Sequence, residues 1–271
     1  MDLDDKFNIN LHEEKIYSQN GEDGILQFIF SKIGTTNRFF VEFGVENGLE
    51  CNTRYLLEKK GWKGLMMDYS EEKQINLKYF LERAWYKRKL GFSEKIRKVK
   101  GSLKKITEYP KSAIQLEIKN EKVTAENIQG LFQKYNVPKN FDLLSIDIDY
   151  NDYWVWKSIV DYHPRVVVIE YNSSLLPTES RVVPYDPDAR WDGTNYFGSS
   201  LLALYNLGLK KGYTLVGCDS KGINTFFVKN ELVKGMKIKN LQDLYRPPKY
   251  GKIVNGRHIG HPPNNKEMIR I

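Results

Sequence analysis

The segment from Phe39 to Gly48, which reads FFVEFGVENG, constrains the fold of this chain more than any other segment. Its apolar run ends in Glu-x-Gly-x-x-x-Gly, a pattern typical of a buried strand that turns sharply into a helix. Gly44 and Gly48 allow the backbone to approach a ligand closely, and Glu42 can accept hydrogen bonds from a hydroxyl or an ammonium group. Turns of this kind also occur in αβ folds that bind no cofactor. The segment therefore predicts a strand, a turn and a helix that suit a nucleoside cofactor.

Glu46 indicates the charge of that cofactor. The dinucleotide-binding fingerprint Gly-x-Gly-x-x-Gly needs its second glycine to leave room for a pyrophosphate, and Glu46 occupies that position. Because a carboxylate repels phosphate, the motif weakens the interpretation as a nicotinamide dehydrogenase. An acid in the turn suits a positively charged cofactor, and S-adenosylmethionine, with its sulfonium and amino groups, is the candidate. We also assign Asn47 to this cofactor-binding turn.

A second short apolar strand is predicted at residues 64–67, about 20 residues beyond the glycine turn, and it ends in Asp68. An acid in this place can bind both ribose hydroxyls through its two oxygens. The structural alternative is that Asp68 is the N-cap of a helix that begins at Ser70, and both roles can hold at once. We assign Asp68 and its neighbour Tyr69 to the cofactor site.

Apolar runs alternate with amphipathic stretches along the chain, which predicts βα units and a mostly parallel sheet. The predicted strands cover residues 39–43, 64–67, 113–118, 143–146, 166–169, 214–217 and 224–228, and residues 96–99 compete for the third position. The predicted helices cover residues 24–32, 49–60, 71–88, 125–135, 152–162 and 199–211, with Thr124 as the N-cap of the fourth. Residues 219–222 suit the turn of an antiparallel hairpin. We therefore expect an α/β fold, a Rossmann-like seven-stranded sheet with a C-terminal antiparallel hairpin and helices on both faces.

Length and composition predict one large αβ domain, because 271 residues with 41% hydrophobic content can enclose a full core. We place this domain at residues 1–240, with an N-terminal lid at about residues 1–36 and a substrate loop at about residues 173–197. Residues 241–271 are expected to pack on the surface or fray. No run of 18 apolar residues occurs and the amino terminus is polar, so we expect a soluble, cytoplasmic protein with no membrane span. Cys51 and Cys218 lack metal spacing and are expected to be buried thiols.

The formal charge of +8 comes from basic residues dispersed among acids, which favours a solvated surface over a nucleic-acid-binding one. The densest basic stretch, residues 86–105, is able to guide an anionic substrate, although a plain lysine-rich exterior is the stronger interpretation. A base-modifying methyltransferase would carry Asn/Asp-Pro-Pro-aromatic after the fourth strand, where this chain has Asp-Ile-Asp-Tyr at residues 147–150. We therefore expect no sequence-specific nucleic-acid partner.

Four oxygen-bearing side chains follow two predicted strands that are successive along the chain. Asp147 and Asp149 come after the fourth strand, and Glu170 and Asn172 come after the fifth. Because open αβ sheets bind ligands at the carboxyl ends of their strands, we expect the four side chains to converge beside the cofactor. Such a cluster suits Mg²⁺ or Mn²⁺, or it supplies a general base that also orients a hydroxyl. The structural alternative is that these acids cap helices and hold loops.

The chain resembles class I S-adenosylmethionine-dependent methyltransferases of the FkbM-like type. The resemblance covers about residues 15–230 and is carried by YSQNGEDG at 17–24, VEFG at 41–44, GLMMD at 64–68, DLLSIDID at 142–149, VIEYN at 168–172 and GYTLVGC at 212–218. It implies methyl transfer to oxygen on a small molecule, or on a sugar or surface-polysaccharide precursor. The basic stretch described above is what allows this acceptor to be anionic. A nucleotide-cofactor-binding oxidoreductase and a non-catalytic binding protein on the same fold stay open as alternatives.

The resemblance implies that Glu42 and Gly44 form the cofactor turn, that Asp68 binds the ribose, and that Asp147 and Asp149 lie at the active-site strand end. The remaining assignments come from the residue patterns described above. Eight residues are assigned to the cofactor site: Gln19 from the lid, Glu42, Gly44, Asn47, Gly48, Asp68, Tyr69 and Asp147. Asp147, Asp149 and Glu170 are the catalytic residues, and the same three with Asn172 are the candidate metal ligands. The candidate substrate-binding residues are Tyr150, Asn172, Arg181 and Trp191. Tyr150 is a departure, because related sequences often have glycine there, and it is expected to narrow the pocket.

The implied mechanism is in-line displacement. An acceptor hydroxyl, deprotonated by an acid or polarised by a metal, attacks the methyl carbon of the sulfonium, and alignment supplies most of the catalysis. Histidine is the usual general base in such a reaction. His163 precedes a strand at the wrong end of the sheet and is expected to be structural, whereas His258 and His261 can reach the site only if the tail folds back.

Overall fold

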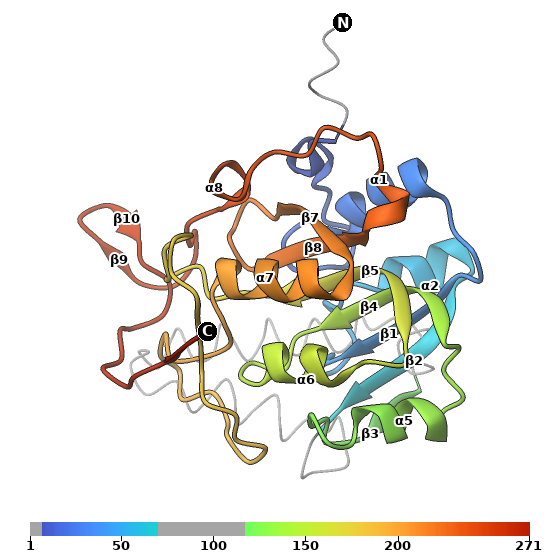
Figure 1. Cartoon of the computed structure of the whole chain (residues 1–271), viewed down its shortest axis with the longest axis horizontal. Coiled ribbons are helices and arrows are strands. Elements are labelled where there is room, and N and C mark those ends of the chain that lie inside the picture. Colours follow the sequence, from blue (N-terminus) through green and yellow to red (C-terminus); the bar gives the residue numbers. More distant parts are fainter. Residues whose placement is uncertain (1–6, 70–116) are drawn as a thin grey trace, which may run out of the picture.

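A seven-stranded sheet forms the centre of the computed structural model, which describes residues 7–69 and 117–271 (Figure 1). Its strands are β1 (Phe39–Phe43), β2 (Lys63–Asp68), β3 (Ile118–Asn120), β4 (Asn140–Ile146), β5 (His163–Glu170), β7 (Tyr213–Cys218) and β8 (Asn224–Lys229). Their order across the sheet is β3-β2-β1-β4-β5-β8-β7. Strands β1 to β5 run parallel, and β8 pairs antiparallel with both β5 and β7. The predicted α/β class, with a mostly parallel sheet and a closing hairpin, is confirmed.

Helices cover both faces of this sheet (Figure 1). One face packs against α5 (Ile128–Lys134), α6 (Asp152–Ser158) and α7 (Leu201–Lys211), and the other against α1 (Glu22–Ile33) and α2 (Arg54–Lys60). The central strands β4 and β5 are buried along most of their length, as expected for parallel strands that lie between two helical layers. Within the described ranges, no helix has the length and apolar character that crossing a bilayer requires. Both cysteines are buried free thiols, as predicted.

Several helix ends differ from the prediction because turn chemistry overrides the apolar pattern. The predicted helix 49–60 starts only at Arg54, and the predicted helix 152–162 ends at Ser158. The fourth helix begins at Ile128 with Asn127 as its N-cap, so the assignment of that role to Thr124 is wrong. Thr124 and Asn127 instead exchange two hydrogen bonds, from the Thr124 amide to Asn127 Oδ1 at 2.8 Å and from the Asn127 amide to Thr124 Oγ1 at 3.3 Å. This local ring delays the first helical turn.

The third predicted strand differs in position. The structure places β3 at Ile118–Asn120, in parallel register with β2. Most of the predicted strand 113–118 lies outside the described residues. The predicted helix 71–88, the competing strand 96–99 and the basic stretch 86–105 lie outside them as well.

Two segments without regular patterning in the sequence pack against each other. We call residues 173–197 the connection and residues 241–271 the tail. In the connection, β6 (Arg181–Val182) pairs antiparallel with β11 (Ile269–Arg270) of the tail. The tail also contains α8 (Leu241–Leu244) and the small hairpin of β9 (Ile253–Val254) and β10 (Arg257–His258). Figure 1 shows the tail in red, extending beside the connection and away from the sheet.

Candidate functional site

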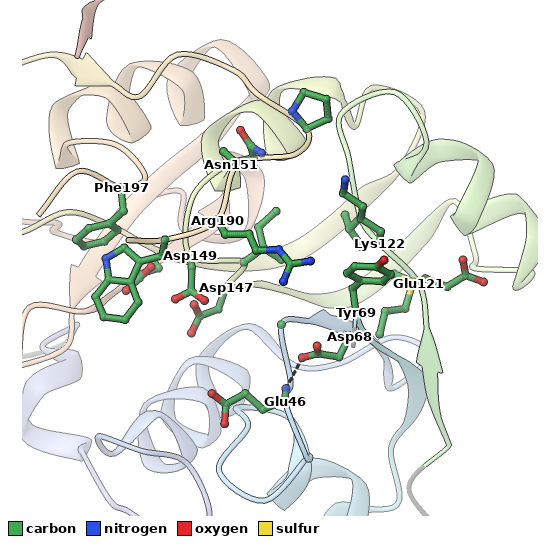
Figure 2. Close-up of a pocket in the computed structure, with 18 of the residues that line it drawn as sticks. Glu46, Asp68, Tyr69, Glu121, Lys122, Asp147, Asp149, Asn151, Arg190 and Phe197 are labelled. Carbon is green, nitrogen blue, oxygen red and sulfur yellow. Dashed lines mark hydrogen bonds between the residues drawn. The ribbon is translucent and has the colours of Figure 1, made fainter. Parts of the chain in front are cut away.

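A cleft of about 860 Å³ lies at the carboxyl ends of β1, β2, β4 and β5. The connection, from which Figure 2 labels Arg190 and Phe197, and the tail also contribute lining residues. Eight of the predicted site residues line it: Gln19, Gly44, Asp68, Tyr69, Asp147, Asp149, Glu170 and Trp191. Six predicted site residues are not among the lining residues: Glu42, Asn47, Gly48, Tyr150, Asn172 and Arg181.

Gly44 is required by the approach of two strands. Its φ of 80° lies in the left-handed region, and its amide donates to the Met67 carbonyl at 3.0 Å. A Cβ atom at this position would lie 1.4 Å from the Asp147 carbonyl oxygen, so no other residue fits without moving β1 or β4. The glycine therefore serves the packing of the two strand ends that also border the cleft.

Glu42 does not contact the cleft, which corrects the expectation that it binds a ligand directly. Its carboxylate accepts hydrogen bonds from the Asn52 amide at 2.8 Å and from the Thr53 amide at 3.0 Å. The Thr53 and Ser145 hydroxyls donate to the same carboxylate. Burial raises the pKa of Glu42, while these four donors favour its charged form. Glu42 therefore fixes the turn that precedes α2.

Asp68 connects the end of β2 to the glycine turn. Its Oδ2 accepts a hydrogen bond from the Glu46 amide, and Figure 2 shows this bond beneath the cleft. Burial raises the pKa of Asp68, and the nearby Glu46 charge raises it further. Asn47 and Gly48 are used within the turn, through hydrogen bonds from the Leu49 amide to Asn47 Oδ1 and from the Gly48 amide to the Val45 carbonyl. They support the turn and do not line the cleft.

Asp147, Asp149 and Glu170, which we call the acid triad, lie close together as predicted. Each offers one carboxylate oxygen, and these oxygens lie within 4.8 Å of one another. Burial raises the pKa of Asp147 and of Glu170 well above its usual range, and the charges of the neighbouring acids add to the effect. Among the described residues, no hydrogen-bond partner is found for the buried Glu170 Oε2. Asp149 has a φ of 66°, an uncommon conformation that aspartate tolerates better than most residues.

Asp152 is a buried acid beside the triad that the sequence analysis did not single out. It is the first residue of α6, and its Oδ1 accepts a hydrogen bond from the Ile148 amide at 2.9 Å. Burial raises its pKa to about 7, and the Asp149 charge contributes. The signal in the sequence was an acid that opens a helix directly after the strand-end loop.

Asn172 does not belong with the acid triad, which corrects its assignment as a metal ligand and a substrate-binding residue. Its Nδ2 donates to the carbonyls of Asn195 at 2.7 Å and Phe197 at 3.1 Å. Its Oδ1 accepts from the Ser174 amide at 3.2 Å. Asn172 is fully buried and holds the connection against the end of β5. The candidate metal ligands are therefore three carboxylates.

Two further substrate-binding assignments are not supported by the geometry. Arg181 lies in β6 and pairs with Glu179 at 2.8 Å, outside the cleft. Tyr150 is buried, and its ring packs edge-on against Tyr196 with a centroid distance of 6.1 Å. It does not line the cleft, so the expected narrowing of the pocket by this side chain is not seen.

Four ring side chains, which we call the aromatic wall, line the cleft: Trp191, Phe197, Tyr250 and His261. The His261 ring is at the centre of the group, with centroid distances of 4.5 Å to Trp191, 5.7 Å to Phe197 and 5.2 Å to Tyr250. The tail therefore folds back onto the site and brings His261 with it. His258 remains exposed on β10, and His163 is exposed at the start of β5. The sequence analysis missed Phe197 and Tyr250 because no periodic pattern marks either segment.

The N-terminal segment reaches the cleft through Gln19. The acids around it are used to hold the segment in place. Asp23 Oδ2 accepts hydrogen bonds from the amides of three successive residues, 16, 17 and 18. Glu22 accepts from Asn20 and from Asn224 in β8. These buried acids therefore fix the backbone that carries Gln19.

Acids dominate the described lining of the cleft. Seven of its residues are acidic and two are basic, Lys122 and Arg190, although the whole chain has a formal charge of +8. A cleft of this kind attracts cations, including organic cations and hard metal ions. Comparison with protein-family models and with curated proteins finds no match to this chain. Function is therefore argued from the chemistry of the cleft.

Proposed function

We propose that the chain is an S-adenosylmethionine-dependent methyltransferase of the FkbM-like type, which methylates a hydroxyl group of a small molecule or of a sugar precursor of surface polysaccharide. The cleft carries this proposal: the glycine turn after β1, the acid that ends β2 and the acids that follow β4 line one cavity. Ligands of open αβ sheets bind at this edge. The antiparallel hairpin of β7 and β8 favours a methyltransferase over a nicotinamide dehydrogenase, whose sheet is wholly parallel.

The cofactor is assigned to the end of the cleft that contains Gln19, Gly44, Asp68 and Tyr69. Asp68 is the partner of the ribose hydroxyls, and the exposed ring of Tyr69 offers a face to the adenine. The amino acid part lies beside Gly44 and Gln19. S-adenosylmethionine has a sulfonium and an ammonium group, so the acidic lining favours its binding.

The acceptor is assigned to the acid triad. Its hydroxyl oxygen attacks the methyl carbon, the carbon–sulfur bond breaks with its electron pair staying on sulfur, and the hydroxyl proton passes to a triad carboxylate. The products are a methyl ether and S-adenosylhomocysteine. A raised pKa makes a carboxylate a better acceptor for such a proton, and burial raises the pKa of both Asp147 and Glu170.

In an alternative version of this proposal, a divalent cation bound by the acid triad activates the acceptor hydroxyl in place of a carboxylate base. The three oxygen ligands within 4.8 Å of one another favour it, since Mg²⁺ and Mn²⁺ prefer carboxylates. Such an ion would polarise the acceptor hydroxyl. Loss of turnover with a chelator and its recovery with Mg²⁺ or Mn²⁺ would favour the metal, whereas chelator-insensitive turnover would leave the carboxylates as the base.

The decisive test of the cofactor is calorimetric titration with S-adenosylmethionine. We expect binding to the wild-type protein and a loss of about 1–3 kcal/mol in the Asp68→Ala variant, the range for removing a charged hydrogen-bond partner. Asp161→Ala is the matched control, because Asp161 is exposed at the opposite edge of the sheet, just before β5. Unchanged affinity in folded Asp68→Ala protein would contradict the ribose assignment. Tighter binding of NAD⁺ than of S-adenosylmethionine would favour the oxidoreductase alternative.

A further inference from the structure

The aromatic wall borders the same cleft as the acid triad, and the two groups together have the chemistry of an ammonium-binding site. We infer that the acceptor carries an ammonium group, which the aromatic wall and the acid triad bind together. The part of this inference that makes the bound molecule a methyl acceptor rests on the proposed function. The binding of the ammonium group itself does not.

Tyr250 connects the two groups of residues. Its ring packs against His261 in the wall, its phenol oxygen lies 3.4 Å from the Ser173 hydroxyl oxygen, just after the end of β5, and it lines the same cleft as Glu170. Figure 2 shows Phe197 on the same side of the site as Asp149, while Tyr69 and Lys122 lie on the other side. An ammonium group in this part of the cleft would therefore meet ring faces and carboxylates together, the two partners that such a cation prefers.

The wall is held in place from both sides of His261. The Lys252 amide donates to the Gly260 carbonyl at 2.7 Å, and the Asn195 amide donates to the Pro262 carbonyl at 2.9 Å. A Cβ atom on Gly251 would lie 2.0 Å from the Gly260 carbonyl oxygen, so the two backbone segments are in close contact there. No described residue hydrogen-bonds to the imidazole of His261. The ring is therefore positioned by its neighbours' backbone, and within residues 7–69 and 117–271 its nitrogens have no hydrogen-bond partner.

The wall itself has little positive charge to repel a cation. Burial lowers the pKa of His261, which keeps the imidazole neutral at neutral pH. The titratable group that packs directly against it is Tyr250, and burial raises the pKa of this phenol to about 12, so it is neutral too. The wall thus presents uncharged rings beside carboxylates.

An ammonium group fits this part of the cleft better than a metal ion or an anion does. The Asn172 amide is occupied in holding the connection, and ring faces supply no ligand for a hard metal. An anionic group would lie close to the acid triad and would be repelled by its carboxylates. The described lining contains only two basic side chains that could offset this repulsion. The earlier expectation of an anionic acceptor is therefore not favoured.

The test compares choline with 3,3-dimethylbutan-1-ol, which has the same shape without the charge. Both are titrated calorimetrically into the full-length protein, with and without S-adenosylhomocysteine. We expect choline to bind at least about ten-fold more tightly than the neutral alcohol. Trp191→Leu is expected to weaken choline binding about 5- to 30-fold, and Trp191→Phe, which keeps a ring face, to weaken it less. His258→Ala is the control, because His258 lies in the same tail as His261 and does not line the cleft, so choline affinity should not change.

Each outcome bears on the inference. Equal affinity for choline and the alcohol, no detectable choline binding, or an unchanged choline affinity in folded Trp191→Leu protein would overturn it. Displacement of choline by Mg²⁺ at equimolar concentration would also overturn it, since the acid triad would then be a metal site. Choline binding without any binding of S-adenosylhomocysteine would support the ammonium site while contradicting the proposed function.

Discussion

Replacing Asp152 with asparagine is expected to stabilise the fold at pH 8. Asp152 is fully buried, and its Oδ1 accepts one hydrogen bond from the Ile148 amide at 2.9 Å. Among the described residues its Oδ2 has no hydrogen-bond partner. Asparagine keeps the acceptor oxygen and removes a charge that burial disfavours.

The size and the sign follow from the raised pKa. Burial moves the pKa of Asp152 from 3.8 to about 7, so the folded state binds this proton more tightly than the unfolded state. The stabilisation from that proton is complete below pH 3.8 and is lost as the pH rises through about 7. A shift of about 3 units at 1.36 kcal/mol per unit sets an upper limit of about 4 kcal/mol. The Asp149 charge causes part of this pKa shift, so the shift does not belong to Asp152 alone. We therefore expect the free energy of unfolding of the asparagine variant to rise by about 1–3 kcal/mol at pH 8 and by clearly less at pH 5.

The assay is urea unfolding at pH 5 and at pH 8, followed by circular dichroism. Asp161→Asn is the control, because this exposed acid should change the free energy of unfolding by less than about 0.5 kcal/mol at either pH. An equal effect of Asp152→Asn at both pH values would refute the argument from burial. So would a destabilised variant at pH 8, which would mean that the Asp152 charge has a partner.

Three further predictions concern the cleft. Asp147→Asn and Asp149→Asn should each lower turnover by about two orders of magnitude, the value of a positioned base, and near-normal turnover in both would remove the acid triad from the mechanism. Calorimetry should find cofactor affinity nearly unchanged in Asp149→Asn, because, of the two acids, only Asp147 is also assigned to the cofactor site. Gln19→Ala should weaken S-adenosylmethionine binding by about 1 kcal/mol, and an unchanged dissociation constant would leave Gln19 as a structural residue. Gly44→Ala should prevent folding, because the new Cβ atom would lie 1.4 Å from the Asp147 carbonyl oxygen. Soluble variant protein with a wild-type melting temperature would show instead that the ends of β1 and β4 can separate.

The sheet was predictable because its central strands carry the plainest signal. The predicted first strand has the bounds of β1, and the predicted strands 143–146 and 166–169 fall inside β4 and β5. Their apolar runs reflect burial on both faces. Helix starts were less predictable, because α2 begins after a turn whose amides bind Glu42, a residue about ten positions earlier. Such a contact depends on the tertiary structure and leaves no local periodicity.

The acids of the site were predictable by position, and their individual roles were not. A residue that ends a parallel strand must lie at the ligand-binding edge, which is why Asp68 and the acid triad were found. Whether a strand-end side chain turns into the cleft depends on distant segments. Asn172 turns away because the Asn195 and Phe197 carbonyls accept its hydrogen bonds. Tyr250 and His261 were out of reach for the same reason, since only the folding of the tail onto the connection brings them to the cleft.

Two buried acids elsewhere in the fold contrast with Asp147 and Glu170 of the acid triad, which are half-buried. Asp142 is fully buried, and its carboxylate accepts hydrogen bonds from Thr36, Arg38 and Arg165. Glu42 likewise has four donors. The side chains of Asp147 and Glu170 accept no hydrogen bond from any residue in the described ranges, although burial raises the pKa of both. Asp142 and Glu42, which serve the fold, have hydrogen-bond donors from the protein itself, because an unpaired buried charge is costly. Asp147 and Glu170 are half-buried at the ligand-binding edge and have no donors among the described residues, which supports the proposal that they bind a positively charged partner.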